Sequence, residues 1–210
     1  MPTADTRSSI FSTTKGLCDA MKEFKNDVEA IADYLEKKQK DFDAVMQMSR
    51  DIIRSAGQTI TLLHNDEKDE AEKRLEEMSA IVKKLQKIDS RFKYNTLQAY
   101  QEYVEAYVFH SIKTNKKIPT LSKLGVENEA YLLGLMDVVG ELKREILEHL
   151  RHSDIKKAEW YFDMMKQIYD GTRKLRFAEA VLSGFRKKQD VARIQIENAG
   201  SEILSFRNRS

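Results

Sequence analysis

The sequence predicts an all-α protein. Apolar residues recur at spacings of three and four, and strictly alternating, strand-like runs are absent. Proline occurs only at Pro2 and Pro119, so the stretch between them holds no proline that would interrupt a helix. Glycine is also scarce, with 8 in 210 residues. Long, uninterrupted helices are therefore expected.

The first helix is expected over about 16–64, after a Ser- and Thr-rich segment, residues 1–15, that we expect to be frayed or disordered. At ~1.5 Å per residue this helix would reach roughly 70 Å if unbroken. That is long for a compact chain of this size. The helix is therefore expected to curve, to break or to pack on another subunit.

The remaining helices are separated by turn-forming residues. They are expected over about 67–88, 90–116, 127–152, 153–170 and 185–204. Ser153 or Asp154 is expected to cap the fifth helix, which should resume past Gly171. The clear loop is 114–128, around Pro119 and Gly125. Residues 16–210 are thus expected to form a single helical domain.

Composition narrows the functional class. The formal net charge is +2, so any nucleic-acid-binding surface must be local. The single cysteine, Cys18, excludes an intramolecular disulfide. No apolar run approaches the roughly 20 residues that span a bilayer, and the polar N-terminus lacks a signal-peptide core. A cytoplasmic protein without a membrane segment is expected.

The helix predicted over 90–116 carries two acids in apolar surroundings. Glu102 and Glu105 share one face of a helical wheel with small and apolar neighbours. The opposite side holds the expected core stripe of Leu97, Tyr100, Val104 and Tyr107. The helix is therefore expected to be buried nearly all round. Burying carboxylates is costly unless something neutralises them.

The helix predicted over 127–152 repeats this arrangement. Asp137 and Glu141 are four residues apart and share a face with Gly134 and Gly140. Two glycines beside two acids would allow another helix to approach closely. If this helix and the preceding one form an antiparallel hairpin around Pro119, the four acids can meet.

Four carboxylates without an obligatory cationic partner repel one another. A hard divalent cation, Mg²⁺ or Mn²⁺, resolves this because both take oxygen ligands. Two alternatives remain open. Arg144 could neutralise one acid on its own, and most acid pairs in this charged chain are solvated among Lys and Arg.

Five stretches resemble the translin/TRAX family, and TRAX more than translin. They are SRDIIRSAGQTITLLH (49–64), QEYVEAYVFHSIKT (101–114), YLLGLMDVVGELKREIL (131–147), QIYDG (167–171) and ENAGSEIL (197–204). The resemblance implies a bundle of about seven helices. It also implies a metal-dependent endoribonuclease whose acidic cluster matches Glu102, Glu105, Asp137 and Glu141 here.

The same resemblance implies partners and a mechanism. The substrate would be single-stranded RNA, with single-stranded DNA as an alternative ligand. Cleavage would be phosphodiester hydrolysis at a four-carboxylate Mg²⁺ or Mn²⁺ site. Our hypothesis is that one carboxylate not fully committed to the metal, Glu105, acts as the general base. Family members form closed octameric shells that enclose RNA. A compact chain like this one resembles a stand-alone microbial member, so a homo-oligomer is expected, an octamer by resemblance.

Basic residues that could hold RNA phosphates occur in clusters. Arg50 and Arg54 share a helix face within 49–64, and Arg144 is a further candidate to contact phosphate instead of acid. The other candidates are Arg173, Lys174 and Arg176, followed by a further cluster at Arg186, Lys187 and Lys188. The alternative interpretation is that these runs are solvated or paired with neighbouring acids.

Three competing functions stay open. A translin-like protein would bind RNA or single-stranded DNA without cutting it, with its acids paired to Arg144 or a lysine. An all-α nucleoside-triphosphate pyrophosphohydrolase would also hold Mg²⁺ on Glu-x-x-Glu and a second acidic pair, and would act on free nucleotides. A purely structural oligomer would use the acids for packing, although buried unpaired acids stabilise packing poorly.

Overall fold

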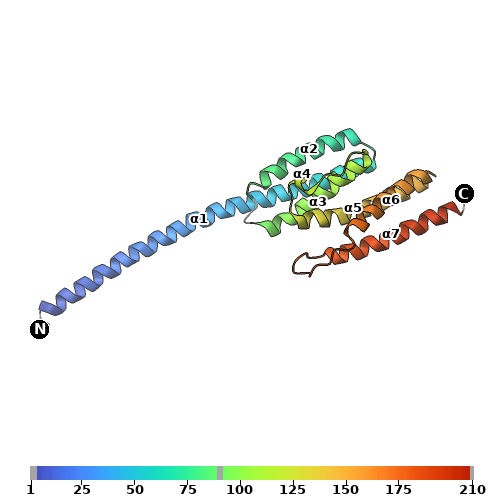
Figure 1. Cartoon of the computed structure of the whole chain (residues 1–210). Helices are drawn as coiled ribbons and strands as arrows, with labels where there is room; N and C mark the ends of the chain where they lie inside the picture. Colours follow the sequence, from blue (N-terminus) through green and yellow to red (C-terminus); the bar gives the residue numbers. More distant parts are fainter. Residues whose placement is uncertain (1–3, 89–91, 209–210) are drawn as a thin grey trace. The chain divides into compact units, whose positions relative to one another are not determined.

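The computed structural model of the protein describes residues 4–88 and 92–208, with side chains from residue 20 onward. Seven helices and no strand occur within these ranges (Figure 1), which confirms the all-α prediction. They are α1 (Ala4–His64), α2 (Lys68–Leu85), α3 (Lys93–Lys113), α4 (Leu121–Leu124), α5 (Asn128–Arg151), α6 (Ile155–Thr172) and α7 (Phe185–Arg207).

The chain divides into two compact units between Ala44 and Val45, so α1 contributes to both. α1 is one unbroken helix over Ala4–His64, so the break that was one of the three expected alternatives does not occur. In the first unit, the apolar side chains from Met21 to Leu35 are exposed. The side chains of residues 1–15 lie outside the described part, so a frayed start and a single domain over 16–210 stay predictions.

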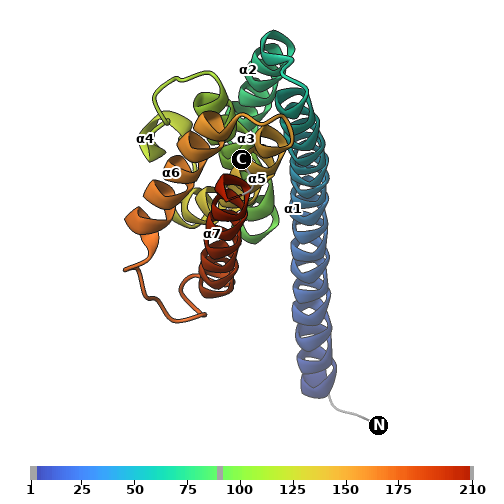
Figure 2. The same cartoon turned by 90° about the vertical axis from the view of Figure 1, so that its right-hand side faces the viewer.

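In the second unit, α5 packs against α3, α6 and α7 (Figures 1 and 2). The apolar faces of these helices meet in one core, to which α5 contributes Leu142 and Ile146, α3 Phe109, and α6 Tyr161 and Met165. Burying side chains of this size is the main favourable term for a helical bundle. α5 therefore has helices around much of its circumference.

The predicted antiparallel hairpin of the third and fourth long helices is wrong, because α3 and α5 run parallel. An ion pair of 2.8 Å joins Lys93 and Glu127 at the N-terminal ends of the two helices. A second, also 2.8 Å, joins Lys113 at the end of α3 to Glu145 in the C-terminal half of α5. The chain after α3 returns through the short α4, and Gly125 (φ 66°) ends it.

The segment between α6 and α7 also differs from expectation. α6 begins at its predicted cap, where the Asp154 side chain accepts a hydrogen bond from the Lys157 backbone. It ends at Thr172 and does not resume past Gly171 as a helix. Turns lead to Gly184, whose φ of 75° suits glycine, and α7 starts there.

α7 runs antiparallel to α6. The Gln189 amide at its start donates to the Thr172 carbonyl, and Arg207 at its end pairs with Glu159 near the start of α6. This return places α7 alongside α5 as well (Figure 2). Across the described residues, no helix is both long enough and apolar enough to cross a membrane.

Candidate carboxylate site

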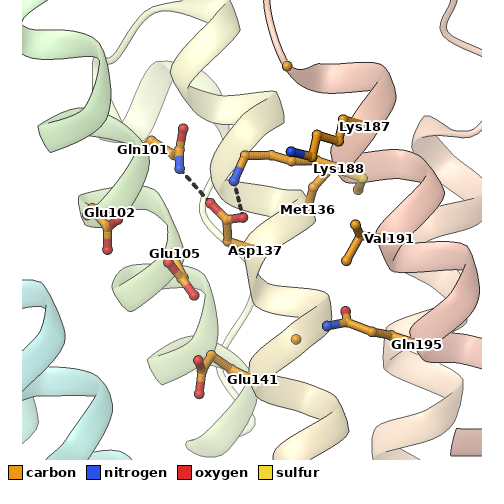
Figure 3. Close-up of a pocket in the computed structure, with 12 residues that line it drawn as sticks. Gln101, Glu102, Glu105, Met136, Asp137, Glu141, Lys187, Lys188, Val191 and Gln195 are labelled. Carbon is orange, nitrogen blue, oxygen red and sulfur yellow. Dashed lines mark hydrogen bonds and ion pairs between the residues drawn. The ribbon is translucent and has the colours of Figure 1, made fainter. Parts of the chain in front are cut away.

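The four predicted acids line one cleft of about 580 Å³ (Figure 3). Glu102 and Glu105 come from α3, and Asp137 and Glu141 from α5. α7 forms the third wall. The parallel arrangement thus brings the acids together, although the predicted hairpin does not exist. The cleft is also lined by Gln101, Met136, Gly140, Gly184, Lys187, Lys188, Val191 and Gln195.

Glu105 is the most buried of the four, with 7% of its surface exposed. No hydrogen bond or ion pair to another described residue involves Glu105 or Glu102. Burial, and then the negative charges of Asp137, Glu102 and Glu141, raise the pKa of Glu105 to about 9. Burial and Asp137 also raise the pKa of Glu102. The α3 acids are thus short of positive charge.

Asp137 has two partners. The Gln101 amide donates to one carboxylate oxygen at 2.6 Å, and the Lys188 ammonium of α7 donates to the other (Figure 3). Lys188 belongs to the basic cluster 186–188 noted in the sequence. A lysine is therefore the cation that meets this acid, whereas Arg144 is exposed and forms no ion pair with the four acids among the described residues.

Glu141 is held by a histidine that no sequence pattern indicated. His64, the last residue of α1, lies 2.5 Å through Nε2 from Glu141 and 2.7 Å through Nδ1 from Glu145. Burial lowers the pKa of His64, but the hydrogen bonds to both glutamates outweigh it and raise the pKa overall. Glu145 also accepts a hydrogen bond of 2.8 Å from Lys113.

The donor set fits a hard divalent cation in its chemistry, since all four side chains offer carboxylate oxygens to one cleft. The positions of these side chains fit a bound cation less well than their chemistry does. Within the described ranges, no group of three or more His, Cys, Asp or Glu side chains is placed to hold a metal ion. Shared coordination by three or more acids would thus require different side-chain positions from those seen here.

The predicted RNA-binding residues lie outside this cleft. Arg50 and Arg54 are exposed on α1, where Arg54 pairs with Asp51 of its own helix. Arg173 and Arg176 line a second cleft of about 640 Å³ on α6 and α7, and Lys174 is exposed beside them. The two lysines that line the carboxylate cleft, Lys187 and Lys188, come from the third cluster.

A sequence signal existed for part of what was missed. Glu141 and Glu145 are four apart on one helix, and His64 ends the family-like stretch 49–64. Nothing in the sequence shows that these groups meet, because they are separated by 77 and 81 residues.

The all-α bundle agrees with the fold of one known family. The sequence pattern of the Translin family matches residues 23–200, and the chain belongs to this family. The protein MJ0175 of Methanocaldococcus jannaschii, described as uncharacterised, is 32% identical over 185 residues, which cover 86% of this chain and 83% of the relative.

Solved structures agree with this assignment. A structure of AfC3PO in complex with duplex RNA has a TM-score of 0.79 and 28% identity, over 87% of this chain and 97% of that one. A crystal structure of AfC3PO gives the same TM-score and coverage at 30% identity. Apo-NeC3PO has the same fold, with a TM-score of 0.79 over 85% and 96% of the chains, at 21% identity.

Proposed function

We propose that this protein is a TRAX-like, metal-dependent endoribonuclease that binds RNA and hydrolyses its phosphodiester bonds in the carboxylate cleft. RNA as the ligand is supported by family membership and by the related AfC3PO, whose structure includes duplex RNA. Single-stranded RNA is the substrate that the sequence favours, with single-stranded DNA as an alternative ligand. The observation that supports catalysis is Glu105, a buried carboxylate that lies beside three others and pairs with no other residue in the described part of the chain.

Glu102, Glu105, Asp137 and Glu141 would hold Mg²⁺ or Mn²⁺. A bound cation would polarise a phosphoryl oxygen and lower the pKa of the attacking water. Glu105 is protonated at neutral pH in the absence of other positive charge, because its pKa is about 9. It serves as general base only once positive charge in the cleft has lowered that pKa.

Lys187 and Lys188 on α7 would meet phosphates at the cleft, since ammonium groups bind phosphate without reading sequence. Arg50, Arg54 and Arg144 remain proposed contacts for RNA outside it. The same proposal extends to Arg173, Lys174 and Arg176, two of which line the second cleft.

We also propose a homo-oligomer, an octamer by family resemblance. In the first unit, exposed apolar residues follow the alternating three-and-four spacing of a helix–helix seam: Met21, Phe24, Val28, Ile31 and Leu35. Over residues 20–44 the helix carries acids and bases of both signs, which suits neither an anionic membrane nor RNA. A second copy of the chain is the partner that this stripe fits.

Two observations favour a second function, an RNA-holding protein without catalysis. Lys188 already neutralises Asp137, and the described acids are not gathered around a common point. Such a protein would keep the fold, the assembly and the RNA affinity while its cleft stayed free of metal.

A calorimetric titration with Mn²⁺ separates the two functions. The proposed nuclease binds Mn²⁺, and Glu105→Gln weakens the binding by roughly tenfold or more, as expected for loss of a ligand. Glu77→Gln, a change at an exposed position on α2, serves as the matched control and leaves it unchanged. No Mn²⁺ binding by the wild type would support the RNA-holding alternative.

A further inference from the structure

His64 joins two carboxylates of α5 through opposite sides of one ring. Nε2 contacts Glu141 Oε2 and Nδ1 contacts Glu145 Oε1. Ionised carboxylates only accept hydrogen bonds, so each ring nitrogen must carry a hydrogen to serve both. The ring also packs against Phe109 of α3, with centroids 5.0 Å apart. The imidazole is therefore fixed by contacts on three sides.

Glu145 is the anchor of this arrangement and not part of the cleft. Its side chain is 4% exposed, and both of its oxygens are engaged, Oε1 by His64 and Oε2 by Lys113. The Lys113 side chain is 6% exposed. Buried and paired on both oxygens, Glu145 holds the Nδ1 side of the histidine ring in place.

Glu141 stands at the other end and differs from Glu145 in two respects. It lines the carboxylate cleft, and its side chain is 24% exposed. His64 engages only Oε2, and no interaction between described residues involves Oε1. The chain of contacts from Lys113 through Glu145 and His64 thus ends on a carboxylate with one oxygen left for a ligand.

We propose that His64 is a positioning residue that holds Glu141 so that its second oxygen serves a divalent cation in the cleft. The inference rests on the proposed metal site and adds a residue from α1 to it. A glutamate side chain has several rotatable bonds and loses entropy when it is fixed. A hydrogen bond from a buried, anchored ring offsets that cost before the cation arrives. Such outer hydrogen bonds typically change metal affinity by roughly 10–100-fold.

The competing explanation is structural, namely that His64 only ties the end of α1 to α5. Two substitutions separate these roles because each keeps one donor. The amide nitrogen of glutamine lies near the position of Nε2, so His64→Gln keeps the bond to Glu141 and loses the one to Glu145. The amide of asparagine lies near Nδ1, so His64→Asn keeps Glu145 and loses Glu141. Both variants lose one buried hydrogen bond.

The test is Mn²⁺ affinity, measured by calorimetry and by the electron paramagnetic resonance of free Mn²⁺, with folding checked by circular dichroism. His64→Asn is expected to bind Mn²⁺ roughly tenfold or more weakly, and His64→Gln to stay much closer to the wild type. The control His152→Gln removes an exposed histidine that pairs with Glu148 and changes nothing. Lys113→Met, which loosens the anchor without altering the ring, is expected to weaken binding by a smaller factor.

Equal affinities in the asparagine and glutamine variants would overturn the inference and leave His64 a structural tie. If the asparagine variant fails to fold, unchanged Mn²⁺ affinity in Lys113→Met overturns it instead. Failure of the proposed function gives a different result, because the wild type itself then does not bind Mn²⁺. The positioning role of His64 is overturned together with it.

Discussion

Gly134 of α5 lies against the backbone of α3, and a β-carbon added to it would be 2.6 Å from the Gln101 carbonyl oxygen. Val104 would be 2.7 Å from the same β-carbon. This close approach places the Gln101 amide on Asp137 and sets the width of the carboxylate cleft between α3 and α5. Gly134 is therefore needed for the close approach of α3 and α5. Gly140, the other glycine beside the acids, faces only the Gln195 side chain.

Gly134→Ala should force α3 and α5 apart. We expect a loss of about 1–3 kcal/mol in the free energy of unfolding, typical of overpacking against backbone, measured by urea denaturation. Gly140→Ala is the matched control, since its β-carbon would meet only the end of the Gln195 side chain at 3.4 Å. A destabilised Gly140→Ala beside an unaffected Gly134→Ala would contradict the described helix contact.

Glu105 predicts a pH dependence of stability in metal-free protein. Its pKa of about 9 in the folded state lies above the ordinary value of 4.5. Between these two pH values, the folded state therefore keeps a proton that the unfolded state loses. Stability from this group is present below about pH 4.5 and is lost as pH rises toward 9. One proton contributes at most about 1.4 kcal/mol per pH unit.

Glu105→Gln should remove that slope. In urea titrations with EDTA, its stability relative to the wild type is expected to rise steadily from pH 5 to pH 8. Glu77→Gln on the exposed face of α2 should follow the wild type throughout. If the stability difference for Glu105→Gln is flat across this range, Glu105 is not protonated in the folded state.

In the proposed metal site, Lys188 would compete with the cation for Asp137. Lys188→Met removes the ammonium group and is expected to increase Mn²⁺ affinity several-fold in a calorimetric titration, because Asp137 becomes available. Lys187→Met is the control: Lys187 lines the same cleft but does not donate to Asp137. Weaker Mn²⁺ binding in Lys188→Met would mean that this lysine supports the metal site and does not compete with it.

The apolar stripe of the first unit predicts an effect on assembly. Ile31→Glu places a charge in the middle of the proposed seam and should reduce the molar mass measured by light scattering, with the fold unchanged by circular dichroism. Asp33→Lys alters an exposed polar position in the same helix and should leave the mass as it is. An unchanged mass for Ile31→Glu would exclude the stripe as a subunit contact.

Much of the fold and part of the site follow from sequence patterns. Helical periodicity predicts the long helices, and the wheel places Glu102 and Glu105 on one face and Asp137 and Glu141 on another. In the structure both faces line one cleft. A helical wheel shows on which face of its helix a side chain lies. It does not show whether a neighbouring helix runs parallel or antiparallel, so it does not predict the parallel course of α3 and α5.

The partners of the acids were not predictable in the same way. Arg144 is a basic residue on the same face of the helix as Glu141, three positions further on, yet it is exposed. Lys188 from α7 and His64 from α1 meet the acids instead. These contacts join residues 51 and 77 positions apart, so only the packing of whole helices determines them. The spacing of residues along the sequence therefore does not predict such pairs.

The most direct test of the central claim is cleavage of a short labelled single-stranded RNA, with a matched duplex, in Mg²⁺, Mn²⁺ or EDTA. Wild type is compared with Glu105→Gln and Asp137→Asn, and RNA binding is followed in parallel. We expect cation-dependent cutting by the wild type that both variants lose while they still bind RNA. RNA that is bound but never cut, under every condition, would contradict it and identify an RNA-holding protein whose Asp137 is neutralised by Lys188.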